Sequence, residues 1–147
     1  MAQILILPLA KIESEYSGIM NEIAAFLHRE GYYGPAGVDL LKDEKTGKDY
    51  IVDLNVRIPG SVIVGLLSNH FTKRGLNWAC LEEDVKLPFN RDEFLKKMHR
   101  EICEGRLIIV MWHENWNVGE SLACFVLGAE TEDMLKKFLT NLKNMGK

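Results

Sequence analysis

Acidic and amide side chains recur on two neighbouring stretches of the chain that one short turn separates. Asp39 lies in the first stretch, and Asp53 and Asn55 lie in the second. Carboxylate and amide oxygens are the hard ligands that magnesium takes in proteins, and manganese accepts the same ligands. These residue types therefore indicate a divalent-metal site, provided that the fold brings the two stretches together.

Two strands joined by a turn would bring them together. Residues 36–42 and 48–56 are rich in Val, Ile and Leu, which predicts strands. Residues 43–47 supply the Asp, Thr and Gly that are typical of a turn. The pattern therefore predicts a β-hairpin whose strands carry the polar residues.

The expected register places the two aspartates side by side. With the turn centred near Thr46, position 39 lies opposite position 53. Alternate residues of a strand share a face, so Asp53, Asn55 and Arg57 should point the same way. Like charges that face each other across a strand pair are destabilising, which favours a cation between them. The alternative is a solvated polar hairpin face without a bound ion.

The residues after the hairpin are suited to anions. Arg57 has two interpretations: a contact to a phosphate or carboxylate group, or a structural ion pair with the aspartates. Gly60 and Ser61 begin the next predicted helix, whose free N–H groups suit an anionic substrate group. The alternative for Ser61 is a simple helix N-cap.

The motif Gly37-Val38-Asp39, followed by Asp-x-Asn-x-Arg at residues 53–57, resembles the metal-binding half of the ATP-grasp ligases. Together with Ile58-Pro59-Gly60-Ser61, His70-Phe71 and Arg74-Gly75, it is similar to a poorly characterised fungal subgroup of that family. The resemblance covers residues 1–80 well and the remainder loosely. The first acid of the Asp-x-Asn motif is Asp, whereas Glu is commoner in the family.

The resemblance implies roles for these residues. Asp39, Asp53 and Asn55 would hold magnesium, or manganese, against the phosphates of ATP. Arg57 would be the catalytic residue that faces the transferred phosphoryl group or the acceptor carboxylate, beside Gly60 and Ser61 at the substrate.

The resemblance also implies an activity. ATP-grasp ligases phosphorylate a small carboxylate substrate with ATP, and an amine then displaces phosphate from the acyl phosphate to give an amide-type bond. Complete members carry a preceding lobe, a lid and lysines that hold the nucleotide. We therefore expect this chain to be a fragment that is inactive alone. The alternative is a non-catalytic interaction or regulatory module that self-associates, for example as a dimer. A metal-dependent phosphohydrolase is a third interpretation.

The composition and net charge of the chain limit the classes of partner that it is expected to bind. The 147 residues are 47% hydrophobic and 27% charged, with a net charge of −3, which argues against nucleic acid and anionic membranes as partners. No apolar run is long enough to span a bilayer, and the N-terminus lacks the basic region of a signal peptide. Isolated Cys80, Cys103 and Cys124 predict reduced interior thiols of a cytoplasmic protein.

The periodicity predicts an α+β fold, a two-layer antiparallel sheet with helices packed on one side. Residues 1–80 would form the lobe with the metal hairpin, and residues 81–147 an α+β extension packed on the same domain. A loop is expected from Gly75 to Pro88. The other expected elements are strands at 3–7, 106–113 and 121–127, and helices at 14–29, 61–73, 90–104 and from 131.

Two further groups of residues have structural and functional interpretations. His70 lies on the apolar side of a predicted helix, which favours a partly buried, hydrogen-bonded side chain. Trp112, His113 and Trp116 lie around the second predicted hairpin and would line an acceptor pocket, or would pack as an aromatic hairpin edge.

Overall fold

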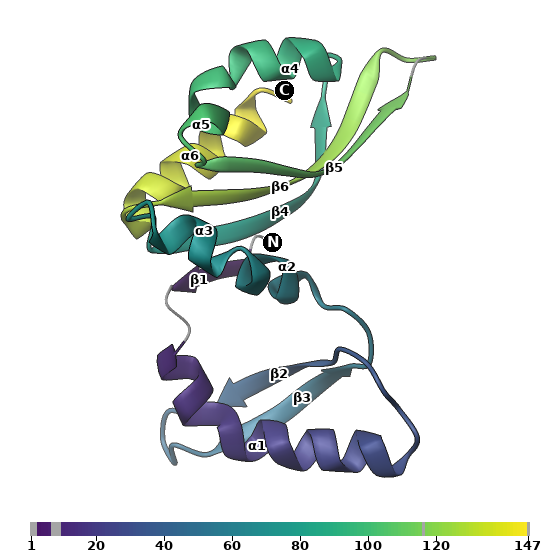
Figure 1. The fold of residues 1–147 in the computed structure, drawn as a ribbon, viewed down its shortest axis with the longest axis vertical. Coiled ribbons are helices and arrows are strands. Elements are labelled where there is room, and N and C mark those ends of the chain that lie inside the picture. The colour runs from purple at the N-terminus through teal and green to yellow at the C-terminus, as the bar shows by residue number, and fades with distance from the viewer. Residues whose placement is uncertain (1–2, 7–9, 116, 147) are drawn as a thin grey trace. The chain divides into compact units, whose positions relative to one another are not determined.

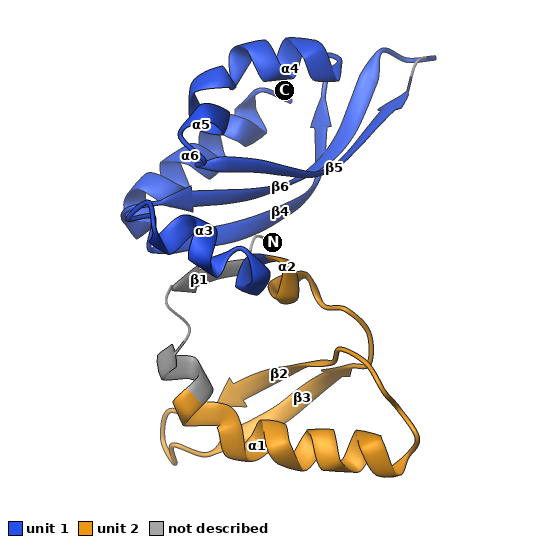
Figure 2. Ribbon diagram, in the orientation of Figure 1, with its two compact units in different colours: residues 1–9, 64–147 blue, residues 10–63 orange. Residues whose placement is uncertain are grey.

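The computed structural model describes residues 3–6, 10–115 and 117–146 (Figure 1). The chain divides into two compact units, residues 10–63 and residues 64–147 with the N-terminal residues 1–9 (Figure 2). The expected division between residues 80 and 81 falls inside a strand of the larger unit.

The larger unit contains a four-stranded antiparallel sheet with the order β1-β4-β6-β5 (Figure 1). Its central strands are β4 and β6, and each is ten residues long. The strands are β1 (Gln3–Ile6), β4 (Trp78–Leu87), β5 (Leu107–Asn115) and β6 (Glu120–Ala129).

Four short helices and one longer helix complete this part of the chain. The longer one, α6, contacts β4 and β6, and its first turn is capped by Thr131, whose hydroxyl accepts from the N–H of Met134. The first short helix, α2, spans the division between the two units. The helices are α2 (Gly60–Leu66), α3 (Ser68–Thr72), α4 (Arg91–Lys97), α5 (His99–Cys103) and α6 (Glu132–Asn144).

The main core lies between one face of the sheet and the helices α4 and α6. Phe125 of β6 stacks on Phe94 of α4, with ring centroids 4.9 Å apart. Leu135 and Leu142 of α6 are fully buried in the same cluster. The spacing of Leu135 and Leu142 places both on one side of α6, as an amphipathic helix requires.

The opposite face of the sheet is also covered. Phe71 of α3 packs against Gly128 of β6, where an added Cβ atom would lie 2.4 Å from the phenyl ring. Gly128 points away from the face of Leu127 and Ala129 because alternate residues of a strand point to opposite faces. Helices therefore pack on both faces of this sheet, whereas the sequence predicted them on one.

The segment expected to be a loop is strand β4. Its acidic residues are accommodated by a register shift between Glu82 and Val85 and by the left-handed conformation of Asp84 (φ 57°). Glu82 is only 8% exposed and is paired with Lys143, at 2.9 Å between Oε1 and Nζ. The prediction of a loop was wrong because a β-bulge lets a charged tripeptide remain within a buried strand.

The smaller unit packs one helix on one hairpin. It contains α1 (Ala10–Arg29), β2 (Gly37–Lys42) and β3 (Asp49–Asn55) (Figure 1). The helix ends before Gly31, which has a φ of +83°. Leu27 is the only side chain of residues 14–63 that is buried. This unit therefore has a thin core.

The α+β class is confirmed, although the strands form two antiparallel sheets instead of one. Among the helices that the structure describes, none combines the length and the apolar character that crossing a membrane demands.

The three cysteines are free but differ in environment. Burial raises the pKa of the Cys80 thiol to about 12, with a smaller contribution from the nearby Glu82 carboxylate. Cys124 is partly buried, but Cys103 is exposed on α5. The prediction of three interior thiols was therefore wrong for Cys103.

Candidate metal-binding hairpin

The hairpin has the register that the sequence predicted around the aspartates. Asp39 of β2 is the direct partner of Asp53 of β3, and Gly37 is the partner of Asn55. Direct partners share a face of the sheet, with Cβ atoms about 4.5–5.5 Å apart. Asp39, Asp53 and Asn55 therefore lie together on one face.

A β-bulge in β3 changes the pattern beyond this group. Leu40 is paired with Ile51, so Val52 has no partner in the register. Because of this shift, Tyr50 is the partner of Leu41 and joins the face of the two aspartates. Leu41 and Tyr50 are 61% and 45% exposed, so the face combines two carboxylates with exposed apolar side chains.

The opposite face of the hairpin is directed toward α1. Lys42 lies on that face, and its Nζ is 2.8 Å from Oε1 of Glu15. The pKa of Lys42 is raised by this hydrogen bond and by the charge of Glu15. Lys42 is thus engaged away from Asp39 and Asp53.

The described residues include no lysine, arginine or histidine in an ion pair with Asp39 or Asp53. Instead, Nδ2 of Asn55 donates to Oδ2 of Asp53, at 3.0 Å. This orientation directs the amide N–H toward Asp53 and leaves the amide oxygen of Asn55 as a ligand for another group. Two carboxylates and one amide oxygen are a donor set that fits a hard divalent cation.

Arg57 lies two residues beyond the end of β3. Its Nη1 donates to the carbonyl oxygen of Ile58, at 3.3 Å. No ion pair joins Arg57 to either aspartate in the described part of the chain, so the structural ion-pair interpretation has no support here. One exposed guanidinium edge is used locally, and the remaining N–H groups can bind an anion.

Gly60 and Ser61 are the first two residues of α2. Since the helix begins at Gly60, Ser61 lies in its first turn and is not the N-cap residue that the sequence suggested. The N–H of Val62 is already bonded to the carbonyl oxygen of Pro59, at 3.1 Å. Both residues are half-buried, and α2 has only seven residues, so its start offers limited anion binding.

Gly37 has a role that the sequence analysis missed. A Cβ atom at this position would lie 2.7 Å from Cγ of Pro59. That Cβ would point to the face of Asp39, because positions 37 and 39 of a strand share a face. Pro59 therefore packs on this face at its Gly37 end, so the chain after Arg57 returns to the start of β2. A glycine inside a predicted strand is the signal for such a close approach.

Replacing Gly37 with Ala should push Pro59 away from the hairpin. We expect a loss of about 1–3 kcal/mol in the free energy of unfolding, the usual cost of overpacking, together with weaker manganese binding. Denaturant unfolding of the purified chain measures the first effect. Gly18→Ala is the control: position 18 has open space in α1, so alanine should stabilise the helix, by up to about 1 kcal/mol. Equal stability of Gly37→Ala and the wild type would contradict the packing argument.

No protein-family model and no curated protein sequence matches this chain. The interpretation of the hairpin therefore rests on its own geometry. No group of three or more His, Cys, Asp or Glu side chains among the described residues is arranged to hold a metal ion. The hairpin supplies two such side chains, and an amide supplies the third donor.

Of the other residues that the sequence singled out, His70 and Trp112 have structural contacts, and Trp112 and His113 also line a hollow beside the start of α4. Nε2 of His70 is 2.9 Å from the carbonyl oxygen of Gly105, which confirms a partly buried, hydrogen-bonded histidine. The ring of Trp112 packs on Phe94 at 5.1 Å, so this residue belongs to the aromatic core. His113 is exposed, and Trp116 lies outside the described residues.

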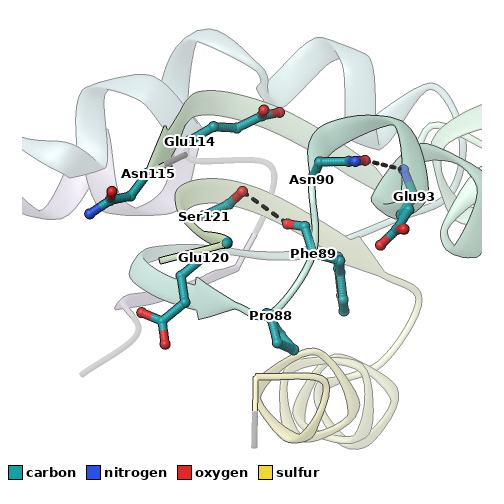
Figure 3. A pocket seen from close by; sticks show the side chains of 9 residues that line it. Pro88, Phe89, Asn90, Glu93, Glu114, Asn115, Glu120 and Ser121 are labelled. Carbon is teal, nitrogen blue, oxygen red and sulfur yellow. Dashed lines mark hydrogen bonds between the residues drawn. The ribbon is translucent and has the colours of Figure 1, made fainter. Parts of the chain in front are cut away.

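A cavity of about 260 Å³ lies in the larger unit, between the start of α4 and the hairpin of β5 and β6 (Figure 3). Its polar groups are engaged locally: Ser121 donates to the carbonyl oxygen of Phe89, and Asn90 caps α4. The carboxylates of Glu114 and Glu120 point in different directions (Figure 3). The cavity therefore lacks the convergent groups of a binding site.

Proposed function

We propose that this chain provides the metal- and phosphate-binding part of an ATP- and magnesium-dependent carboxylate ligase of the ATP-grasp type. The observation that carries the proposal is the direct pairing of Asp39 with Asp53 on an exposed face, beside the amide of Asn55. A like-charged pair at this position costs stability unless a cation binds it. Such a cost is typical of a functional site.

Each residue has one task in this proposal. Asp39, Asp53 and Asn55 hold the cation with their oxygens. Magnesium bound there would neutralise charge on the β- and γ-phosphates of ATP and align them. The guanidinium of Arg57 donates to the oxygens of the transferred phosphoryl group or of the acceptor carboxylate. Packing of Pro59 against Gly37 anchors the segment that follows Arg57 at the Gly37 end of the hairpin.

The reaction needs no protein nucleophile. A substrate carboxylate oxygen forms a bond to the γ-phosphorus of ATP, and ADP leaves. An amine then attacks the acyl carbon, releases phosphate and loses a proton. We expect the partners of this chain to be ATP, a small carboxylate and a nucleotide-binding lobe, in the cytoplasm. The chain alone should not turn over ATP.

A second candidate function is a non-catalytic module that self-associates. The observation that favours it is the number of exposed large apolar side chains in the smaller unit, since such patches usually bind partners. Phe26 of α1 is 46% exposed, and Ile51 of β3 is 54% exposed. The others are Met20, Tyr33, Leu41, Tyr50, Val52, Val56 and Ile58.

Manganese titration followed by NMR tests the metal site in the chain as it is. Paramagnetic broadening should affect residues 37–41 and 51–57 first. Inorganic triphosphate should increase the affinity for manganese, because phosphate oxygens complete the coordination shell. Broadening confined to Glu82, Glu83 and Asp84 would overturn the assignment. Manganese binding at the hairpin without any effect of triphosphate would favour the non-catalytic module.

A further inference from the structure

His99 and Cys103 form a pair on α5 that the proposed ligase does not use. They are one helical turn apart, so their side chains lie on the same side of the helix. The sulfur of Cys103 is 3.5 Å from Nε2 of His99 and 3.9 Å from Nδ1. Both residues are exposed, so an ion from solvent can reach both.

The separation of the two side chains suits a single metal ion. Zinc takes sulfur at about 2.3 Å and imidazole nitrogen at about 2.0–2.1 Å in tetrahedral sites, which separates the two donors by about 3.6 Å. The Sγ to Nε2 distance of 3.5 Å is close to that value.

The other two cysteines do not offer such a pair. Cys80 is buried, and burial raises the pKa of its thiol, which opposes the deprotonation that metal binding requires. Cys124 is partly buried in β6. Within the described residues, neither has a histidine within hydrogen-bonding distance. Cys103 is therefore the thiol of the chain that is placed for metal binding.

A tetrahedral zinc ion needs two more ligands than this pair supplies. The described residues contain no third His, Cys, Asp or Glu grouped with His99 and Cys103. We propose that His99 and Cys103 form half of a zinc site, and that the same two residues of a second copy of this chain complete it. A two-fold axis through the ion gives two thiolates and two imidazoles, the Cys₂His₂ set of structural zinc.

The surroundings of the pair are compatible with a second copy. The nearest cation on the helix, Arg100, is bonded to Glu104 through Nε and Oε1 at 2.8 Å. The charge of Arg100 is thus compensated within each copy. Two thiolates also neutralise the double charge of zinc. Binding of one zinc ion by two chains should release two thiol protons.

Cobalt(II) and zinc titrations of the full chain, kept reduced with a phosphine, test this proposal. The wild type should develop the absorption of a thiolate bound to cobalt, and this absorption should saturate when one ion is bound at His99 and Cys103 for every two chains; an ion at the hairpin carboxylates adds no thiolate absorption. Sedimentation should show a dimer with zinc. Cys103→Ser and His99→Gln should weaken binding at least tenfold and remain monomeric. Cys124→Ser is the matched control and should behave as the wild type.

Three results would overturn the proposal. The first is the absence of thiolate-to-cobalt absorption in the wild type. The second is its persistence in Cys103→Ser. The third is thiolate-to-cobalt absorption that saturates while the chain remains monomeric in sedimentation, which would show that water, not a second copy, completes the shell. None of these depends on the hairpin carboxylates, and Asp53→Asn should leave the cobalt absorption unchanged. Failure here is therefore distinguishable from failure of the ligase proposal.

Discussion

Replacing Asp53 with Asn is expected to weaken manganese binding by more than about tenfold while the chain remains folded. Loss of even an outer partner of a metal ligand costs about 10–100-fold in affinity, and Asp53 supplies a charged ligand directly. Its side chain is exposed and faces Asp39. Stability should therefore change by no more than about 0.5 kcal/mol, as for other surface substitutions, or rise slightly as repulsion with Asp39 is relieved.

Manganese affinity and denaturant unfolding, measured on the same preparation, test the two parts together. Glu44→Gln is the matched control, because it removes one exposed carboxylate from the turn of the same hairpin. In a complete ligase, Asp53→Asn should reduce turnover by about two to three orders of magnitude, the usual effect of removing electrostatic stabilisation from a transition state. If Asp53→Asn unfolds the chain and metal binding falls only with the folded fraction, the pair is structural.

Replacing Arg57 with Lys should separate metal binding from phosphate binding. The guanidinium is not paired with Asp39 or Asp53, so the affinity for manganese alone should stay within a few-fold of the wild type. Lysine cannot reproduce two parallel N–H bonds to one phosphate group, so the exchange is not conservative at a bidentate site. The affinity of the manganese-loaded chain for inorganic triphosphate should fall by more than about tenfold, the order expected from losing one hydrogen bond to a charged group.

Calorimetric titration with triphosphate in the presence of saturating manganese measures this difference. Arg29→Lys, at the exposed end of α1, is the control and should have no effect. Equal triphosphate affinities for Arg57→Lys and the wild type would show that Arg57 contributes only charge.

Features set by local chemistry were predictable from the sequence. In the turn of the hairpin, a carboxylate oxygen of Asp43 accepts from the N–H of Lys45, at 2.8 Å. This interaction lowers the pKa of Asp43 and fixes the turn. The turn sets the register of the two strands and thereby places Asp39 opposite Asp53. The two strands at residues 107–115 and 120–129 were likewise indicated by their apolar runs.

Features that depend on distant contacts were not predictable. Strand β4 was missed because its charged middle breaks the apolar pattern, and its pairing partners lie some 40 residues away in β6. The expected helix 61–73 is interrupted at Leu67. The expected helix 90–104 is interrupted at Met98, whose φ is −105° and ψ is 18°. Helical periodicity continues through both interruptions, so it does not reveal them.

The role of Gly37 shows the same limit at the candidate site. The sequence places this glycine at the start of a strand, but only the fold shows that Pro59 occupies the space of its missing side chain. The bulge at Val52 is a second case, since a plain alternation of residues would direct Tyr50 to the wrong face. Both features change what surrounds the carboxylates without changing the carboxylates themselves.

The thin core of residues 10–63 has a consequence for how the hairpin would respond to its ligand. With one buried side chain among residues 14–63, this unit should open locally at much lower free energy than the sheet of the larger unit, and its amide hydrogens should exchange early. A ligand that binds only the closed form then stabilises it, by about 2.7 kcal/mol at a hundredfold excess over Kd. Closing of residues 10–63 and binding of the metal at the hairpin are then coupled and are measured as one equilibrium. A substitution at Leu27, which is not one of the proposed ligands, would therefore be measured as weaker metal binding.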